Sequence, residues 1–174
     1  MKTRLPNIAI WARSGAGKSF ATKYLEDRYG YETCKPGAIC REVTLRLFGE
    51  DSKTTLNKVN DALRQIEPNI WLRLGFEALS RKDGVLIDGI RFVSNVEFCR
   101  QNGFRMVKIV AEEATRLARL AARGQAFDVK VDGEHSGETE IENESFDHTV
   151  HNERDDPDAL FRQLDAIVDG SAVG

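Results

Sequence analysis

Residues 12–19 limit what this chain can fold into more than any other segment does. They read Ala-Arg-Ser-Gly-Ala-Gly-Lys-Ser and match the Walker A pattern, in which four residues separate a small residue from Gly-Lys-Ser. An apolar segment over 7–12 precedes the loop, and a helical pattern from Lys18 to about Arg28 follows it. A strand, a glycine-rich turn and a helix in this order are the context that binds phosphate. The segment therefore predicts a nucleotide triphosphate site in an α/β fold.

Each residue type in this loop has a chemical reason. Gly15 and Gly17 let the backbone turn its N–H groups inward, and the helix that follows adds its N-terminal dipole. Lys18 can reach the β- and γ-phosphates, and the Ser19 hydroxyl can coordinate Mg²⁺. We expect the nucleotide to be bound by the loop and the start of its helix, that is by Arg13, Ser14, Gly15, Ala16, Gly17, Lys18, Ser19 and Phe20.

The rest of the chain alternates short apolar runs with longer amphipathic ones, which is typical of an α/β fold. We expect strands over 7–12, 31–34, 84–88, 104–110 and 146–150, and helices over 18–28, 37–48, 53–66, 69–80, 95–102, 112–123 and 156–168. Three helices between the second and third strands exceed a simple crossover and indicate an inserted subdomain. The acidic stretch 125–145 has no clear periodicity and is expected to be a surface loop or lid.

Length and composition agree with one globular domain. The chain has 174 residues, of which 41% are hydrophobic and 30% charged. Its 25 basic and 28 acidic side chains give a net charge of −3, which argues against a protein that coats nucleic acid. The three cysteines, Cys34, Cys40 and Cys99, form no C-x-x-C pair and are expected to be free thiols.

No targeting or membrane segment is expected. The apolar run over 8–12 is too short for the core of a signal peptide, and no stretch approaches the ~18 apolar residues of a membrane span. We therefore expect a cytoplasmic protein with no membrane partner.

The loop alone leaves several classes of protein open. A switch GTPase would carry D-x-x-G and N-K-x-D motifs; the nearest approach to the second, residues 57–60, fails at its last position. A hexameric motor ATPase is normally longer. A small kinase fits both the length and the architecture of a core, an inserted acceptor-binding subdomain and a lid.

A more specific resemblance begins at the end of the third expected strand. Residues 86–92 resemble the strand-end D-G-x-x-R element of nucleoside monophosphate kinases, and 88–97 resemble the D-x-R-F-x-N-E region of phage-type deoxynucleoside monophosphate kinases, relatives of dephospho-CoA kinase. Three further segments are similar to that family: 35–41 with 47–49, like its acceptor-side helix; 135–138, like its H-x-S-E lid element but spaced His-Ser-Gly-Glu; and 146–152, like its F-D-x-x-I-x-N strand.

The resemblance implies a P-loop kinase with a five-stranded, parallel, doubly wound sheet. Residues 1–174 would form one domain, with a core over 1–33, 81–123 and 146–170, an acceptor-binding insertion over 34–80 and a lid over 116–145. It implies ATP-dependent phosphoryl transfer to a deoxynucleoside monophosphate with Mg²⁺, a donor base near Asn152 and, for a phage protein, the host cytoplasm.

Two residues after the third expected strand are candidates for the chemistry. Asp88 ends a buried strand at the carboxyl edge of the sheet, where such folds bind ligands. It could hold Mg²⁺ or orient the acceptor; the alternative is a turn or N-cap residue. Arg91 could bridge the acceptor phosphate and the transferring group; the alternative is a surface ion pair.

Arginines on the expected helix 112–123 are candidates for charge neutralisation. Arg116, Arg119 and Arg123 share one stripe at offsets of three and seven, and Arg119 and Arg123 are the favoured catalytic pair. The alternative is a solvated face paired with Glu112 and Glu113. Because the expected lid after residue 124 has no arginine, this helix or a second chain would have to supply the cations.

The acceptor should lie between the core and the insertion, where we expect it to contact Arg41, Arg64, Asp88, Arg91 and Asn95. Trp71 and Phe76 are expected to pack the insertion rather than stack on a base. His135, His148 and His151 have no metal-ligand spacing.

Rival functions stay open. The acceptor could be a hydroxyl, as in dephospho-CoA or a hydroxymethylated base in DNA, although the net charge disfavours a DNA partner. The chain could instead be a regulatory nucleotide-binding ATPase. A small-molecule phosphate acceptor is the favoured partner, and a homodimer is an open alternative.

Overall fold

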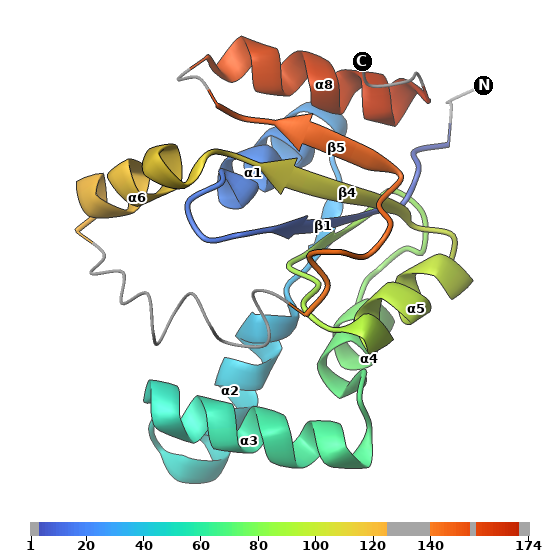
Figure 1. The fold of residues 1–174 in the computed structure, drawn as a ribbon. Helices are drawn as coiled ribbons and strands as arrows, with labels where there is room; N and C mark the ends of the chain where they lie inside the picture. The colour runs from blue at the N-terminus through green and yellow to red at the C-terminus, as the bar shows by residue number, and fades with distance from the viewer. Residues whose placement is uncertain (1–3, 125–139, 154–155, 171–174) are drawn as a thin grey trace.

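The computed structural model describes residues 4–124, 140–153 and 156–170. Five strands form one sheet in the order β2-β3-β1-β4-β5, and every neighbouring pair is parallel. The strands are β1 (Ile8–Ala12), β2 (Glu32–Cys34), β3 (Val85–Asp88), β4 (Arg105–Val110) and β5 (His148–His151). Because parallel strands need crossover connections, helices must follow them, and the expected α/β class is confirmed (Figure 1).

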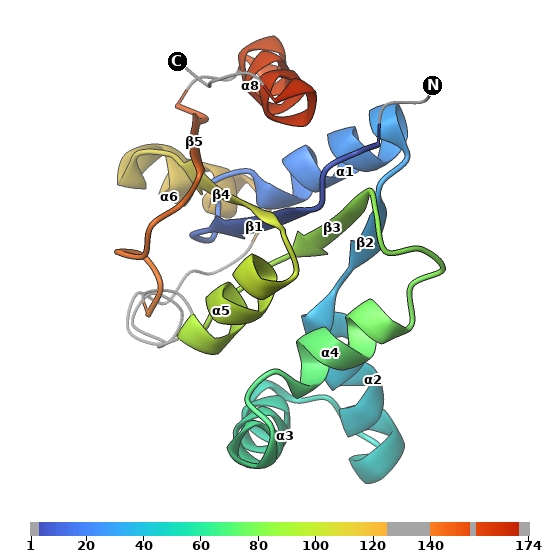
Figure 2. The same ribbon diagram turned by 90° about the vertical axis from the view of Figure 1, so that its right-hand side faces the viewer.

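Helices cover both faces of the sheet (Figure 2). α1 (Lys18–Tyr29) and α8 (Pro157–Asp169) pack on one face, where Ile10 and Leu25 belong to one buried cluster. α5 (Val93–Gln101) packs on the other, with Trp11 in a second cluster. Alternate β1 residues therefore enter opposite halves of the core, as a strand buried on both faces requires. The doubly wound sheet is confirmed.

Three helices of the insertion lie together beyond one end of the sheet, away from both chain termini (Figure 1). They are α2 (Pro36–Phe48), α3 (Lys53–Ile66) and α4 (Ile70–Glu77), and their shared core contains Cys40, Val59 and Trp71. Trp71 packs there as expected, with its indole N–H donated to Asn60 Oδ1 at 3.1 Å. Phe76 packs edge-on against Phe98 of α5.

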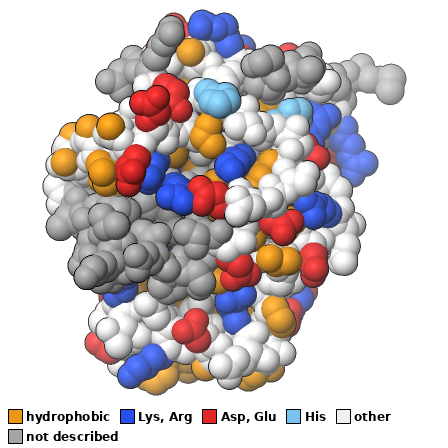
Figure 3. Space-filling model, viewed as in Figure 1, with side chains coloured by type: hydrophobic (Ala, Val, Ile, Leu, Met, Phe, Trp, Pro, Cys, Tyr) orange, Lys and Arg blue, Asp and Glu red, His pale blue; other side chains and the backbone are white. Residues whose placement is uncertain are grey.

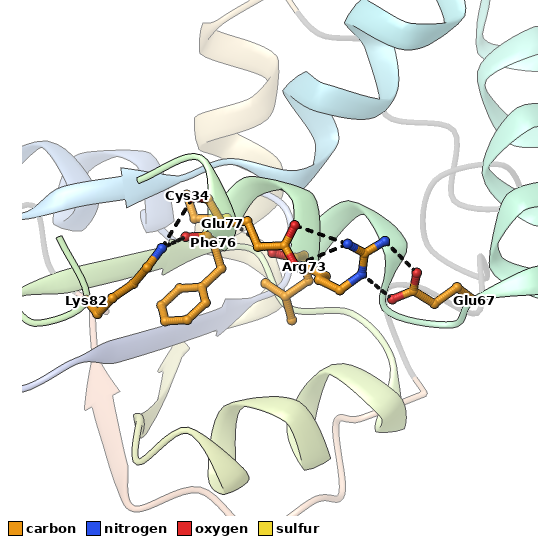
Figure 4. A network of polar contacts seen from close by, with 7 residues as sticks. Cys34, Glu67, Arg73, Phe76, Glu77 and Lys82 are labelled. Carbon is orange, nitrogen blue, oxygen red and sulfur yellow. Dashed lines mark hydrogen bonds and ion pairs between the residues drawn. The ribbon is translucent and has the colours of Figure 1, made fainter. Parts of the chain in front are cut away.

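Polar contacts fasten α4 at both ends (Figure 4). The Arg73 guanidinium donates from Nε and Nη2 to the two Glu67 carboxylate oxygens, both at 2.8 Å, and its Nη1 donates to Glu77. Lys82 donates to the carbonyls of Phe76 and Glu77. The Lys82 bonds close the last turn of α4. The helix α4 is shorter than the expected helix over 69–80, because the chain leaves the helix after Glu77 to reach β3.

The three cysteines are free and buried, as expected. Burial raises the pKa of both Cys34 and Cys99 to about 12, so neither thiol is a ready nucleophile at neutral pH. None of the helices that the structure describes is long and apolar enough to cross a bilayer.

The end of the expected lid is fixed to the core. Ile141 is fully buried in the cluster that contains Trp11, and Lys108 of β4 donates to the carbonyl of Glu142 at 2.8 Å. Residues 140–145 of the expected surface loop are therefore docked on the core, by one buried apolar side chain and a hydrogen bond to the backbone. Residues 125–139, with His135, lie outside the described residues.

The tyrosines make the fold sensitive to alkali. Burial is the main cause that raises the pKa of all three, to about 12 for Tyr24. Tyr24 and Tyr29 also donate to Asp165 Oδ1 at 2.6 and 2.7 Å. Because the folded pKa of Tyr24 lies above the unfolded value of about 10, the stability that its neutral side chain contributes is present below pH ~10 and is lost as the pH rises towards 12. The raised pKa values of Tyr29 and Tyr31 act in the same direction.

We therefore expect the native protein to show little tyrosinate absorbance until it unfolds in alkali. Asp165→Asn should lower the apparent pKa of two tyrosines and leave that of Tyr31 unchanged. Titration of all three near pH 10 with native circular dichroism would contradict this.

Candidate active site

The glycine-rich loop joins β1 to α1 at the carboxyl edge of the sheet. Ala12 ends β1, and α1 begins at Lys18 after Gly17, whose φ is +103°. No side chain caps the N-terminus of α1. Its first N–H groups are therefore left for an anion, as they are in helix N-termini that bind phosphate.

Two buried side chains form hydrogen bonds to the backbone of the glycine-rich loop. Arg116 of α6 (Glu113–Ala122) is only 6% exposed, and its Nη1 donates to the Ser14 carbonyl at 3.1 Å. Asn152 Nδ2 donates to the Ala16 carbonyl at 2.8 Å. Arg116 therefore does not share an exposed stripe with Arg119 and Arg123, because its side chain turns under the loop and fixes the shape of the loop.

The Arg116 backbone and the Asn152 side chain explain both glycines of the loop. A β-carbon on Gly15 would lie 2.6 Å from the Arg116 carbonyl oxygen, and one on Gly17 would collide with Asn152 Nδ2. The resemblance placed Asn152 at the donor base. Its side chain supports the loop, and the residue also lines a hollow beside it, so its place at the donor base stays a prediction.

Gly17→Ala should raise the Kd for ATP by about tenfold or more, because a left-handed L-residue alone costs about 1–2 kcal/mol and the collision moves the loop. Isothermal titration calorimetry would measure it. Gly103→Ala is the matched control: Gly103 has φ +69° with no atom within 4 Å of an added β-carbon. It should lower stability without changing the Kd. Equal effects of the two substitutions on the Kd would contradict the role of Asn152.

Lys18 and Asp88 form an ion pair at the mouth of the loop. Asp88 is the last residue of β3, and its side chain is 13% exposed, against 28% for Lys18. Asp88 therefore faces the lysine rather than capping a helix. The next residue, Gly89, has φ +93°, and a β-carbon there would lie 3.5 Å from Lys18 Nζ. The end of β3 thus brings a carboxylate beside the predicted γ-phosphate position.

A cationic cavity of about 570 Å³ opens beside this pair. Lys18, Lys35, Arg41 and Arg91 contribute positive charge, against the carboxylates of Asp88 and Glu42. Arg91 is exposed, and no residue that the structure describes forms an ion pair with it. A cleft with this excess of positive charge concentrates anionic ligands.

A second cavity, of about 260 Å³, extends from the first between the core and the insertion. The two share Gly37, Arg41, Gly89 and Arg91. Its lining contains no carboxylate among the described residues, and its polar and aromatic side chains are Arg41, Asn57, Asn60, Arg64, Asn69, Trp71, Arg91, Phe92 and Asn95. The positive charge and the amide groups of the lining therefore favour an anionic ligand with a polar body.

Arg41 and Arg64 both line this second cavity, as expected of acceptor residues, but each already has a partner. Arg41 pairs with Asp51 in the turn between α2 and α3. The Arg64 guanidinium lies 3.2 Å from the ring centre of Phe92, and Nε donates to the Pro68 carbonyl at 3.3 Å. Burial lowers the pKa of Arg64. Its stacked position leaves the other guanidinium nitrogens for a ligand.

Asn95 also lines the second cavity, but its side chain holds the protein's own backbone. Its Oδ1 accepts from the N–H of Arg91 at 3.1 Å and of Phe92 at 3.3 Å, and its Nδ2 donates to Asn69 Oδ1 at 2.9 Å. The same bonds make α5 begin at Val93, two residues before the expected helix, because an N3 side chain that reaches back stabilises a helix start.

A third hollow, of about 190 Å³, lies on the other side of the loop. Gly17, Phe20, Arg119, Arg123 and Asn152 line it, together with Asp156 and Pro157 at the start of α8. Arg119 Nη1 donates to the Asn152 carbonyl at 3.0 Å. Among the described residues, Arg119 and Arg123 line this hollow and neither of the two cavities, so their predicted catalytic role stays a prediction.

Several site residues escaped the sequence reasoning. Asn57 and Asn69 line the second cavity, and their only signal was position in the insertion. Lys35 and Phe92 also line the cavities; both lie in segments of the family resemblance but were not predicted as ligands. Arg13 of the loop pairs with Glu142, which lies in the docked residues 140–145, a contact between distant parts of the sequence.

On the described part of the face in Figure 3, acidic and basic side chains are interspersed.

Two curated relatives are similar in sequence. The "UPF0200 protein" of Methanothrix thermoacetophila is 32% identical over 124 residues, which cover 70% of this chain and 68% of the relative. That of Thermococcus kodakarensis is 31% identical over 130 residues, covering 70% of each chain. No protein-family model matches the chain.

Solved structures resemble the chain over nearly its whole length. A Thermus thermophilus protein gives a TM-score of 0.65 at 18% identity, covering 97% of this chain and 98% of that one. Shikimate kinase from Bacteroides thetaiotaomicron gives 0.61 at 14%, with 95% and 99% covered, and a gluconokinase from Sinorhizobium meliloti gives 0.60 at 16%, with 95% and 94% covered. The fold is that of the P-loop kinases.

Proposed function

We propose a function for this chain from the premise that it belongs to the UPF0200 family and has the fold of the P-loop kinases. It is an ATP-dependent phosphotransferase that acts on a small acceptor. The observation that carries this proposal is the Lys18–Asp88 pair, which stands between the glycine-rich loop and the cationic cavity. A donor phosphate on the loop and an acceptor in the cavity would meet at that pair.

The acceptor that fits best is a deoxynucleoside monophosphate, which would become the diphosphate. Arg41 and Arg91 are shared by both cavities, so they suit a phosphate at the boundary. The second cavity offers several amide side chains and no described carboxylate, which suits the polar edge of a nucleobase. The sequence resemblance to nucleoside monophosphate kinases points to the same acceptor class.

The residues present fit ATP and Mg²⁺. The uncapped start of α1 suits the donor phosphates, and the third hollow, with Phe20, Arg119 and Arg123, suits the donor's nucleoside. The Ser19 hydroxyl and the Asp88 carboxylate are the oxygen ligands that Mg²⁺ prefers. When bound, Mg²⁺ neutralises charge on the phosphates.

The transfer needs mainly position and charge from the protein. Arg41 and Arg91 would hold the acceptor phosphate so that one of its oxygens faces the γ-phosphorus. A new bond forms between that oxygen and the phosphorus while the bond to the departing ADP oxygen breaks. Lys18 neutralises charge on the transferring group. A phosphate acceptor already carries an anionic oxygen, so the reaction needs no general base.

A hydroxyl acceptor is the second candidate, and Asp88 is the observation that favours it. A hydroxyl must lose a proton, and Asp88 lines the cationic cavity where a carboxylate could accept it. Two of the structurally similar proteins are a shikimate kinase and a gluconokinase, whose acceptors carry hydroxyl groups.

One panel of acceptors distinguishes the phosphate-acceptor kinase, the hydroxyl kinase and a regulatory nucleotide-binding protein. Mg²⁺-dependent ADP formation would be measured with the four common deoxynucleoside monophosphates, their ribonucleotide counterparts, shikimate, gluconate, dephospho-CoA and DNA with or without hydroxymethylated bases. Turnover with a monophosphate supports the proposal. Turnover with hydroxyl acceptors alone would replace it with the second candidate. ATP binding without any turnover would leave a regulatory nucleotide-binding protein.

A further inference from the structure

The loop from Gly89 to Phe92, which we call the joint, connects β3 to α5 within the core and faces the insertion across the second cavity. It follows β3 directly, so one end is fixed beside Lys18 by Asp88, and Gly89 N donates to the Ile10 carbonyl at 3.2 Å. The other end leads into α5. Arg91 lies in this joint with an exposed side chain, and both cavities reach it.

We propose that Asn95 is the positioning residue that sets Arg91 against the acceptor, and that the insertion controls it through Asn69. This inference rests on the proposed function, because the acceptor phosphate is what Arg91 would hold. Asn95 acts through Arg91 and is not itself a catalytic residue.

The two ends of the Asn95 amide bind different parts of the protein. One oxygen accepts both backbone N–H groups at Arg91 and Phe92, which fixes the turn that aims the Arg91 side chain. The amide nitrogen donates to Asn69 Oδ1, and Asn69 is the N-cap of α4 in the insertion. One side chain therefore links the backbone of Arg91 to the subdomain that forms the far wall of the cavity.

A second contact joins the same two parts. Arg64 of α3 stacks its guanidinium on the ring of Phe92, the last residue of the joint. A cation over an aromatic face contributes more as water is excluded. The insertion thus makes two contacts here: Arg64 stacks on Phe92 in the joint, and Asn69 accepts a hydrogen bond from Asn95 in the first turn of α5. A shift of the insertion would move the joint with it, so acceptor binding and the aim of Arg91 are coupled.

Four single variants, and a double variant that combines Asn69→Ala with Asn95→Ala, test this assignment. Asn95→Ala removes the hydrogen bonds to the backbone of Arg91 and Phe92 and the hydrogen bond to Asn69. Asn95→Asp keeps an oxygen for the two N–H groups and a second oxygen that can accept from Asn69 once that amide turns over. Asn69→Ala removes only the link to the insertion. Asn102→Ala is the matched control, an exposed asparagine at the other end of α5 whose amide donates to the Phe98 carbonyl.

The first readout is amide hydrogen exchange in the substrate-free protein. Asn95→Ala should speed exchange at residues 91 and 92 by about tenfold, the effect of losing one net hydrogen bond. Asn95→Asp and the control should exchange as the wild type does. Unchanged exchange at both amides in Asn95→Ala would overturn the positioning role, whatever the enzyme's substrate.

The second readout is kinetic, with the acceptor that the wild type turns over fastest. Asn95→Ala should lower kcat/KM for that acceptor by about tenfold and leave the KM for ATP unchanged, with recovery in Asn95→Asp. Asn69→Ala should raise the acceptor KM, and the double variant should be no worse than Asn95→Ala. An unchanged acceptor KM in Asn69→Ala would overturn control by the insertion.

These outcomes separate the inference from the proposed function. If the wild type turns over no acceptor, the proposed function fails, and the exchange experiment still decides whether Asn95 holds the joint. If Asn95→Ala does not fold, Asn95→Asp and Asn69→Ala carry the test, because neither removes the oxygen that caps the backbone.

Discussion

Replacing Lys18 with alanine is expected to lower kcat/KM for phosphoryl transfer by on the order of 10³-fold. Lys18 is the first residue of α1 and pairs with the carboxylate that ends β3, so its ammonium lies where the donor and acceptor phosphates would meet. Truncation removes that charge and leaves Asp88, 13% exposed, without its partner. The remaining negative charge would then oppose the approach of both phosphates. Initial rates of Mg²⁺-dependent ADP formation would measure the effect.

Lys23→Ala is the matched control for this experiment. It removes a lysine from the same helix, but that side chain is 71% exposed and pairs with Asp27 on the surface. A surface pair of this kind contributes little, so activity should stay within about twofold of the wild type. Lys18→Ala with wild-type activity would show that the reaction does not take place at this loop.

Arg91→Ala is expected to lower kcat/KM for the acceptor by about 10²-fold while the Kd for ATP stays unchanged. Arg91 lines both cavities, and no described residue forms an ion pair with it, so its charge is available to a ligand. Arg91→Lys should recover only part of the activity, because an ammonium cannot hold a phosphate through two parallel N–H groups. Acceptor-dependent kinetics with separate ATP titrations would measure both quantities.

Arg46→Ala is the control for the loss of one arginine. Arg46 lies on α2 of the same insertion, is exposed, and pairs with Glu42 one turn away. It should leave the kinetics unchanged. If Arg91→Ala weakened ATP and acceptor equally, Arg91 would belong to the donor site, and the assignment of the two cavities would be wrong.

The sequence predicted most elements of the fold to within a few residues because their patterns are local. Apolar runs marked the strands and 3.6-residue periodicity marked the helices; the third helix ran over 53–66 as expected. The features that it did not predict came from contacts between distant segments. α5 begins early because Asn95 caps it, and residues 140–145 are docked because Ile141 enters the core.

The candidate site also contains residues that the sequence predicted and residues whose roles only the structure shows. The glycine-rich loop, Asp88 and Arg91 were predicted, because a strand end and a motif fix their place on the sheet. The separate roles of Arg116 and Arg119 were not. Both lie on one helix three residues apart, yet Arg116 supports the loop and Arg119 lines a hollow beside it.

By itself, therefore, the sequence determined the α/β class, the glycine-rich loop and the positions of the strand ends, since each depends on a short stretch of chain. Only the tertiary structure decided which arginines face which cavity and which asparagine holds the joint at Gly89–Phe92. Arginines on different helices look alike in a sequence, because any of them can be solvated, paired or buried. Their roles depend on partners tens of residues away, such as Asn69 for Asn95 and Ser14 for Arg116, which only folding brings together.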